Sequence, residues 1–120
     1  MAYSVTEAFV SWLADLGYTA STYPPKTDNE FVTVTRTGGS VSDMVDRPMV
    51  AIQTWAKTEE RAEEMATEIR DAALTGPRPF GVASIRVNAG PYPFWDESTR
   101  LPRYQLYLDC AAQLTATPTE

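Results

Sequence analysis

Side chains suited to catalysis are scarce in this 120-residue sequence. It contains no histidine, so it lacks the usual acid–base group at neutral pH and the commonest ligand of transition metals. Its one cysteine, Cys110, lies in an alternating apolar pattern typical of a strand, which favours a small buried side chain over a reactive thiol. A single cysteine cannot form an internal disulfide, and this fits a reducing compartment.

Carboxylates are the remaining candidates for catalysis. Asp96 and Glu97 beside Glu63 or Glu64 could supply an acid–base pair. That division of roles requires two carboxylates in different environments, and no spacing in the sequence singles out such a pair. No glycine-rich phosphate-binding motif occurs either. The sequence therefore predicts a protein that is not an enzyme and that uses no cofactor or metal.

The overall charge limits the partners of the chain. Sixteen acidic residues against ten basic ones give a net charge of −6 and a pI near 4.6. Tight binding to a phosphate backbone depends on lysine and arginine, so we expect nucleic acid to pass this protein without being held. No secretory leader pattern and no apolar run of about 20 residues are found, and we expect a protein made in the cytoplasm without a membrane span.

Aromatic and arginine side chains form the densest cluster that could bind another protein. Tyr92, Phe94 and Trp95 fall in a stretch of only four residues, inside a segment framed by glycine and proline. Arg100 and Arg103 follow this stretch. Aromatic residues and arginine are enriched at protein interfaces. These five residues are predicted to form a contact surface. The alternative is that the aromatic side chains fold back over the edge of the chain's own sheet.

The segment that runs from Met49 to Trp55 is apolar on both faces of a predicted strand. Val50 and Ile52 would point to one side, while Met49 and Trp55 would point to the other. A strand of this kind is covered on both sides, and a chain this short has helices enough for only one. We therefore expect Met49 and Trp55 to contact a partner.

An acidic helix is predicted after Thr58, ending near residue 76. Its apolar stripe faces the core, and its opposite face carries Glu60, Glu64 and Glu68 at intervals of four residues, where like charges repel. A solvated face is one interpretation. The other is an acidic surface that lines a channel and keeps DNA from adhering by like-charge repulsion.

The other elements follow from local signals. A first helix is predicted to begin at a capping box from Ser4 to Glu7 and to end at Gly17. Alternating patterns predict four strands, at 31–37, 49–55, 82–89 and 103–114. Three connections join them: an extended one at 19–30, a flexible loop at 38–46 that is either a tolerated insertion or a contact arm, and a long segment at 90–102.

These elements predict an α+β fold with one domain at residues 1–114 and a polar tail at 115–120. The order is helix, strand, strand, helix, strand, strand, with a four-stranded, mainly antiparallel sheet and both helices on one face. A right-handed crossover from the second strand to the third allows the fourth to lie between them. The predicted strand order is 3-4-2-1.

Two parts of this pattern resemble a known family. The segments 47–58 and 62–74 are similar to the central part of tail terminator (tail completion) proteins of long-tailed phages, especially phages of high-GC actinobacterial hosts. The segments 90–95 and 102–108 are similar to the family's closing loop and strand. The resemblance covers roughly residues 1–114 and has no catalytic signature. The matched positions are Arg47, Trp55, Gly90, Pro91, Tyr92 and Arg103.

The resemblance implies a structural protein of the virion, located at the junction between tail and neck. Such proteins form a ring, commonly of six subunits, that caps the tail tube, ends its polymerisation and joins it to the head through a head–tail connector protein, while DNA passes through the lumen. Three other functions remain open. One is a different connector role in the neck, and another is a small ferredoxin-like ligand-binding or regulatory domain, which the element order also suits. The third is a carboxylate-dependent enzyme, which only a pair of buried acids with opposed pKa shifts would favour.

Overall fold

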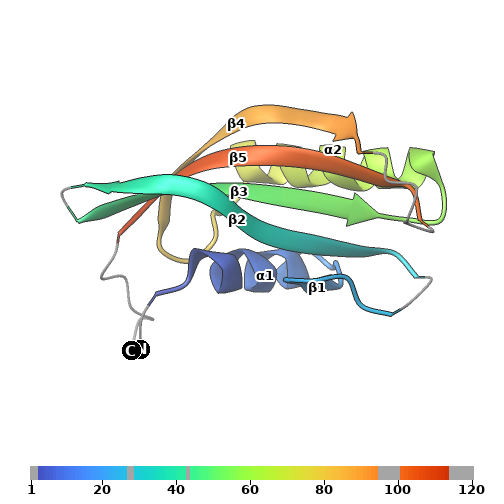
Figure 1. Cartoon of the computed structure of the whole chain (residues 1–120), viewed down its shortest axis with the longest axis horizontal. Coiled ribbons are helices and arrows are strands. Elements are labelled where there is room, and N and C mark those ends of the chain that lie inside the picture. Colours follow the sequence, from blue (N-terminus) through green and yellow to red (C-terminus); the bar gives the residue numbers. More distant parts are fainter. Residues whose placement is uncertain (1–2, 27–28, 43, 95–100, 114–120) are drawn as a thin grey trace.

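The computed structural model describes residues 3–26, 29–42, 44–94 and 101–113. Its five strands form one mixed sheet in the order β1-β2-β3-β5-β4, accompanied by two helices (Figure 1). The predicted α+β class is confirmed. The elements are α1 (Val5–Asp15), β1 (Ala20–Ser21), β2 (Phe31–Ser42), β3 (Val45–Trp55), α2 (Glu59–Thr75), β4 (Val82–Pro93) and β5 (Arg103–Gln113).

The order of the four predicted strands is confirmed, because they correspond to β2, β3, β4 and β5 and lie as β4-β5-β3-β2. The prediction of only four strands is wrong. Ala20 and Ser21 form a fifth strand that pairs in parallel with Val32 and Thr33. The backbone N–H of Val32 also donates to the carbonyl of Thr19 at 2.8 Å. This short pairing depends on the position that the chain occupies after the end of α1, and no local sequence pattern predicts it.

The helix signals in the sequence are confirmed at atomic detail. Ser4 Oγ accepts a hydrogen bond from the backbone N–H of Glu7 at 3.2 Å, and Thr58 Oγ1 accepts one from Arg61 at the same distance. These N-caps satisfy donors that the first helical turn leaves free. Gly17 has a φ of 100°, which a residue with a Cβ rarely adopts, and it follows the end of α1.

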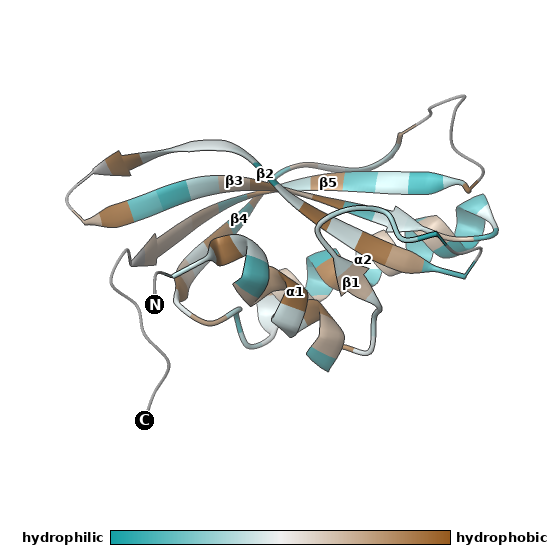
Figure 2. Ribbon diagram, turned by 60° about the horizontal axis from the view of Figure 1, so that its bottom comes forward, coloured by the Kyte–Doolittle hydropathy of each residue, from teal (hydrophilic) through white to brown (hydrophobic). Residues whose placement is uncertain are grey.

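The prediction of a flexible loop at 38–46 is wrong. β2 continues to Ser42 and β3 begins at Val45, so the two strands form one long hairpin that extends past both helices (Figures 1 and 2). The guanidinium of Arg36 holds the Asp46 carboxylate across this hairpin through two hydrogen bonds, of 2.6 and 2.7 Å. The sequence does not predict this pairing, because glycines interrupt the alternation of apolar and polar residues.

The glycines of the hairpin have a specific role. The strand register shifts between Arg36 and Gly38, which marks an irregularity of the β-bulge type. Gly39 has a φ of 120°, and a Cβ there would collide with the carbonyl oxygen of Arg47 on the paired strand. Glycine is therefore what allows β2 to continue along β3 at this point.

A second correction concerns the segment 90–102. β4 does not end at residue 89 but continues to Pro93, with Tyr92 opposite Gln105 on β5. Register shifts at two places between Val87 and Tyr92 carry the strand along its neighbour despite the glycine and prolines. Tyr92 is thus a strand residue, which changes the context of the aromatic cluster.

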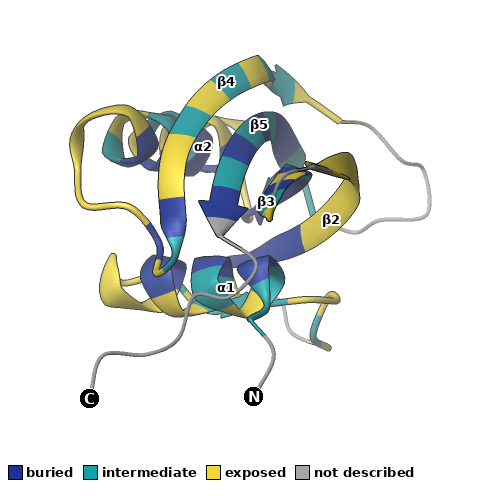
Figure 3. Cartoon of the chain, turned by 90° about the vertical axis from the view of Figure 1, so that its left-hand side faces the viewer, coloured by how far each residue is buried: buried dark blue, intermediate teal, exposed yellow. Residues whose placement is uncertain are grey.

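One face of the sheet packs against both helices, as predicted. Trp12 of α1 is buried there, and its Nε1 donates to the carbonyl of Pro77 at 2.7 Å. The dark blue positions in Figure 3 show buried residues on both helices and on the strands beside them. The core combines Val5, Phe9, Trp12 and Leu13 of α1, Ala62, Met65, Ala66, Ile69 and Ala73 of α2, and Val32, Val34, Val50, Ile52, Tyr104, Leu106, Leu108 and Cys110 of the sheet.

Candidate interaction surface

Neither of the described helices covers the opposite face of the sheet, which is called here the helix-free face. The register places its residues in rows across the strands, with Trp55 between Phe31 and Arg103, and Met49 between Gly38 and Asp109. The first of these rows lies where β2 begins, and the second lies nearer the tip of the hairpin. The two ends of this face differ in composition and in burial.

At the first end, an aromatic–arginine cluster consists of Phe31, Trp55, Phe94 and Arg103. The rings of Phe31 and Trp55 stack with their centroids 5.1 Å apart and 21° between their planes. The Arg103 guanidinium carbon lies 4.5 Å from the Trp55 ring centroid and 4.4 Å from that of Phe94. A guanidinium held between two rings gains cation–π attraction on both sides.

Trp55 is therefore a packed residue of the subunit itself. It is only 5% exposed, and its Nε1 donates to Thr33 Oγ1 at 3.2 Å. Phe94 differs, because it is 36% exposed and forms the outer layer of the cluster. Of these two predicted contact residues, only Phe94 offers substantial surface to a partner in the free subunit.

A polar chain continues from this cluster across the sheet. Arg103 donates to Gln53 Oε1 at 3.2 Å, and Gln53 donates to Gln105 Oε1 at 2.5 Å. Gln105, which is 2% exposed, donates in turn to the Tyr92 hydroxyl at 2.7 Å. The structure thus brings Tyr92, Phe94, Arg103 and Trp55 together. The two glutamines were not predicted, because their place opposite each other could be recognised only once β3 and β5 were known to pair.

Two residues predicted to join this surface, Trp95 and Arg100, lie outside the described residues. Their part in the contact surface stays a prediction.

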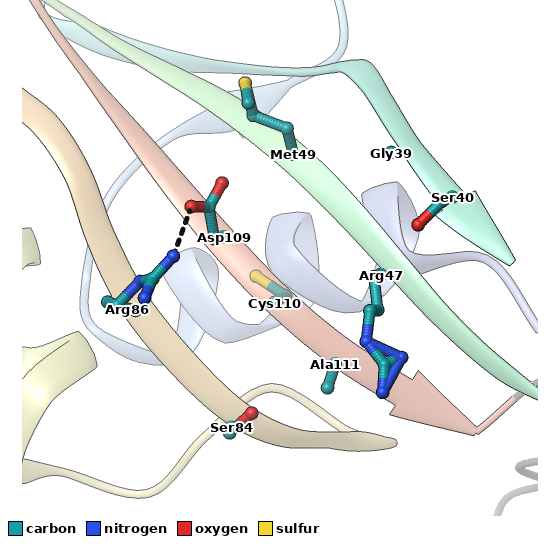
Figure 4. Close-up of a pocket in the computed structure, with 9 residues that line it drawn as sticks. All are labelled: Gly39, Ser40, Arg47, Met49, Ser84, Arg86, Asp109, Cys110 and Ala111. Atoms are coloured by element: carbon teal, nitrogen blue, oxygen red, sulfur yellow. Dashed lines mark hydrogen bonds and ion pairs between the residues drawn. The ribbon is translucent and has the colours of Figure 1, made fainter. Parts of the chain in front are cut away.

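At the second end, towards the tip of the hairpin, an open groove of about 670 Å³ crosses β2, β3, β5 and β4 (Figure 4). Arg86 Nη2 lies 3.4 Å from Asp109 Oδ2, and Asn88 donates to the same oxygen at 2.9 Å. Arg47 is exposed, and the half-buried Met49 projects from the same strand. The lining residues are Gly39, Ser40, Arg47, Met49, Ser84, Arg86, Asp109, Cys110 and Ala111.

Met49 therefore lies in this groove and apart from the aromatic–arginine cluster. Cys110 also lines the groove, but it is only 5% exposed, and burial raises the pKa of its thiol to about 12. The thiol is accordingly neutral at physiological pH and packs as a small apolar group. This placement confirms the expectation of a buried cysteine.

The tip of the hairpin exposes two apolar side chains. Val41 is 57% exposed and Met44 is 61% exposed. Neither residue was predicted to be a contact residue, although two apolar side chains among the polar residues of the segment 40–44 were a usable signal. Exposed apolar side chains at the end of a projecting hairpin are suited to contact with another protein.

The acidic residues predicted on α2 lie on its exposed side. Arg61 pairs with Glu64, and it also donates to both oxygens of Glu30 at 2.9 and 3.0 Å. These hydrogen bonds hold the pKa of the Glu30 carboxyl below its usual value. Tyr18 donates its hydroxyl to Glu68 at 2.5 Å. Glu64 and Glu68 therefore belong to a local network, and Glu60 is exposed one turn earlier.

The chain shows no similarity that assigns it to a family. No family model matches it, and no curated protein is significantly similar in sequence. Within the described residues, no three side chains of histidine, cysteine, aspartate or glutamate come together as a metal site would require. None of the described helices is long and apolar enough to span a membrane.

Proposed function

We propose that this chain is a tail terminator, a structural virion protein that forms a ring on the tail tube and joins the tail to the head. The observation that carries the proposal is the long hairpin, which extends past both helices and exposes Val41 and Met44 at its tip. The second strand of the hairpin, β3, overlaps the segment 47–58, whose sequence resembles the tail terminator family. This combination supports an assembly role over a catalytic one.

A ring subunit needs two different surfaces, one for each neighbour, because head-to-tail contacts close into a ring when the rotation between copies allows it. It needs further surface for the tail tube and for the connector. The hairpin tip, the groove and the outer side of α2 supply separate exposed regions of this kind. Self-association, commonly as a hexamer, and binding to the tail-tube protein and the connector protein follow from the proposal, with DNA passing through the lumen.

The small-molecule alternative gains no support from the groove. A ligand site needs several polar groups that converge on an enclosed space. Here Arg86 and Asp109 interact with each other, and the groove lies open on the sheet surface (Figure 4). A different connector position in the neck would use the same surfaces, so the choice between the two phage roles depends on which protein is bound.

The decisive measurement is sedimentation velocity of the purified chain, alone and with the tail-tube protein of the same phage, combined with electron microscopy of the tubes. We expect a ring-sized species and a ring at one end of each tube. Specific contacts should bury more than about 1,200 Å² in total at each interface. A chain that stays monomeric at high concentration, with and without tubes, contradicts the proposal. Binding to the connector but not to the tube indicates the neck role instead.

A further inference from the structure

The helix-free face and the outer face of α2 carry opposite charge. On the helix-free face the described charged residues are Arg47, Arg86 and Arg103 against Asp109. Helix α2 contains six carboxylates and two arginines, which leaves it at a net charge of −4. These two regions lie on opposite sides of the sheet, since α2 packs on the helix-covered face. One copy therefore cannot bring them together, whereas two copies can.

The lining of the groove combines small residues with two arginines. Four of its nine lining residues are small, and small side chains permit close approach of another backbone. Arg47 on β3 and Arg86 on β4 flank the region on either side of β5 (Figure 4). Strands lie about 4.8 Å apart, so these two arginines stand on strands separated by about 10 Å. The small lining residues are Gly39, Ser40, Ser84 and Ala111.

The spacing of carboxylates on α2 matches this separation. Glu64 and Asp71 both lie on the side of the helix away from the buried Ala66, Ile69 and Ala73. Seven residues of helix correspond to about 10 Å along its axis. Both carboxylates are exposed, with 61% and 60% of their side-chain surfaces accessible. A helix laid across the strands could thus present one carboxylate to each arginine.

We propose that the outer face of α2 of one copy lies in the groove of the next copy. This inference rests on the proposed ring and names the contact that builds it. Because the two surfaces differ, the contact is head-to-tail and leaves a free groove on one copy and a free helix on the other, so that further copies add in the same way. In this arrangement Glu64 and Asp71 face a neighbouring subunit and do not line the DNA channel.

The test uses two variants with reversed charges. The groove variant carries Arg47→Glu and Arg86→Glu, and the helix variant carries Glu64→Lys and Asp71→Lys. Each variant alone has like charges on both surfaces, so we expect at least a tenfold loss of self-association by sedimentation velocity. An equimolar mixture restores opposite charges at every contact, and we expect assemblies in which the two variants alternate. Native mass spectrometry then detects equal numbers of the two chains.

A matched control reverses two carboxylates on the other helix, Glu7→Lys with Asp15→Lys. These residues are also exposed, and this variant should assemble as the wild type does. Melting temperatures of all variants check that each chain still folds. Association of the wild type should weaken with added salt, because salt screens the attraction between exposed charges.

Two results overturn the inference while leaving the ring intact. The first is normal assembly of the helix variant alone, and salt-sensitive DNA binding by that assembly would place α2 at the channel. The second is a mixture that fails to assemble although each variant folds and the control assembles. A wild-type chain that remains monomeric under every condition contradicts the proposed function itself.

Discussion

The two ends of the helix-free face differ in what covers them. At one end, Phe31 and Trp55 are almost fully buried, because they stack on each other and Arg103 lies over the tryptophan. At the other end, Met49 is only half-buried and Arg47 is exposed beside an open groove. Both ends belong to the same strands. The comparison shows that side chains of a sheet can cover part of their own face, and only the uncovered part is available to a partner.

The largest expected effect tests whether the first end is part of the subunit's core. Truncating Trp55→Ala removes a buried ring, its stacking on Phe31 and its hydrogen bond to Thr33. We expect a loss of about 3–5 kcal/mol in the free energy of unfolding, similar to that for Trp12→Ala on the helix-covered face. Urea denaturation of both variants measures it. If Trp55→Ala melts like the wild type and loses only assembly, then the cluster is a contact surface and the comparison fails.

At the hairpin tip we expect a smaller effect, and we expect it on self-association and not on the stability of the subunit. The double variant Val41→Ser with Met44→Ser removes exposed apolar side chains, so the stability of the subunit should change by less than about 1 kcal/mol. Assembly should weaken by about 2 kcal/mol if these residues are interface hot spots. Sedimentation velocity and thermal melting of the same samples separate the two quantities. Leu74→Ser, on the exposed side of α2, extends the measurement to the surface proposed to enter the groove.

Arg103 tests how the aromatic–arginine cluster is held. Arg103→Lys keeps the charge but loses the flat guanidinium that fits between Trp55 and Phe94 and donates to Gln53. We expect a loss of about 1–2 kcal/mol in the free energy of unfolding. Phe94→Ala should cost less, because that ring is partly exposed. Equal stability of Arg103→Lys and the wild type would show that charge alone matters here.

A further prediction concerns stability at alkaline pH. Burial raises the pKa of the Cys110 thiol and that of the Tyr3 hydroxyl to about 12 each, from their ordinary values of 9.0 and 10.0. The unfolded chain therefore releases these protons at lower pH than the folded chain, and stability falls as pH rises above about 9. Urea midpoints at pH 7, 9 and 10.5 measure this slope. In Cys110→Ala the urea midpoint should fall less between pH 7 and pH 9 than in the wild type. A wild-type midpoint that does not change with pH contradicts the burial of both groups.

Local signals were sufficient for several features of the fold. The N-caps at Ser4 and Thr58, the glycine after α1 and the apolar alternation of β5 depend on residues close in sequence, and all were predicted correctly. The order of the four long strands also followed, because a right-handed crossover restricts where β4 can lie. The exposure of the predicted contact residues could not be predicted, since an aromatic residue in a sequence does not reveal whether its own chain covers it.

What the sequence by itself determined, then, is the presence of the two helices and the four long strands, their amphipathic faces and the scarcity of catalytic side chains. Tertiary structure alone decided three things: the pairing of Ala20 and Ser21 with β2, the continuation of the hairpin through Gly38 and Gly39, and the burial of Trp55. Each depends on groups that meet only after the chain folds. Arg36 meets Asp46 only once the register of the hairpin is set, and Arg103 reaches Trp55 across 48 residues, so no local pattern reveals either contact.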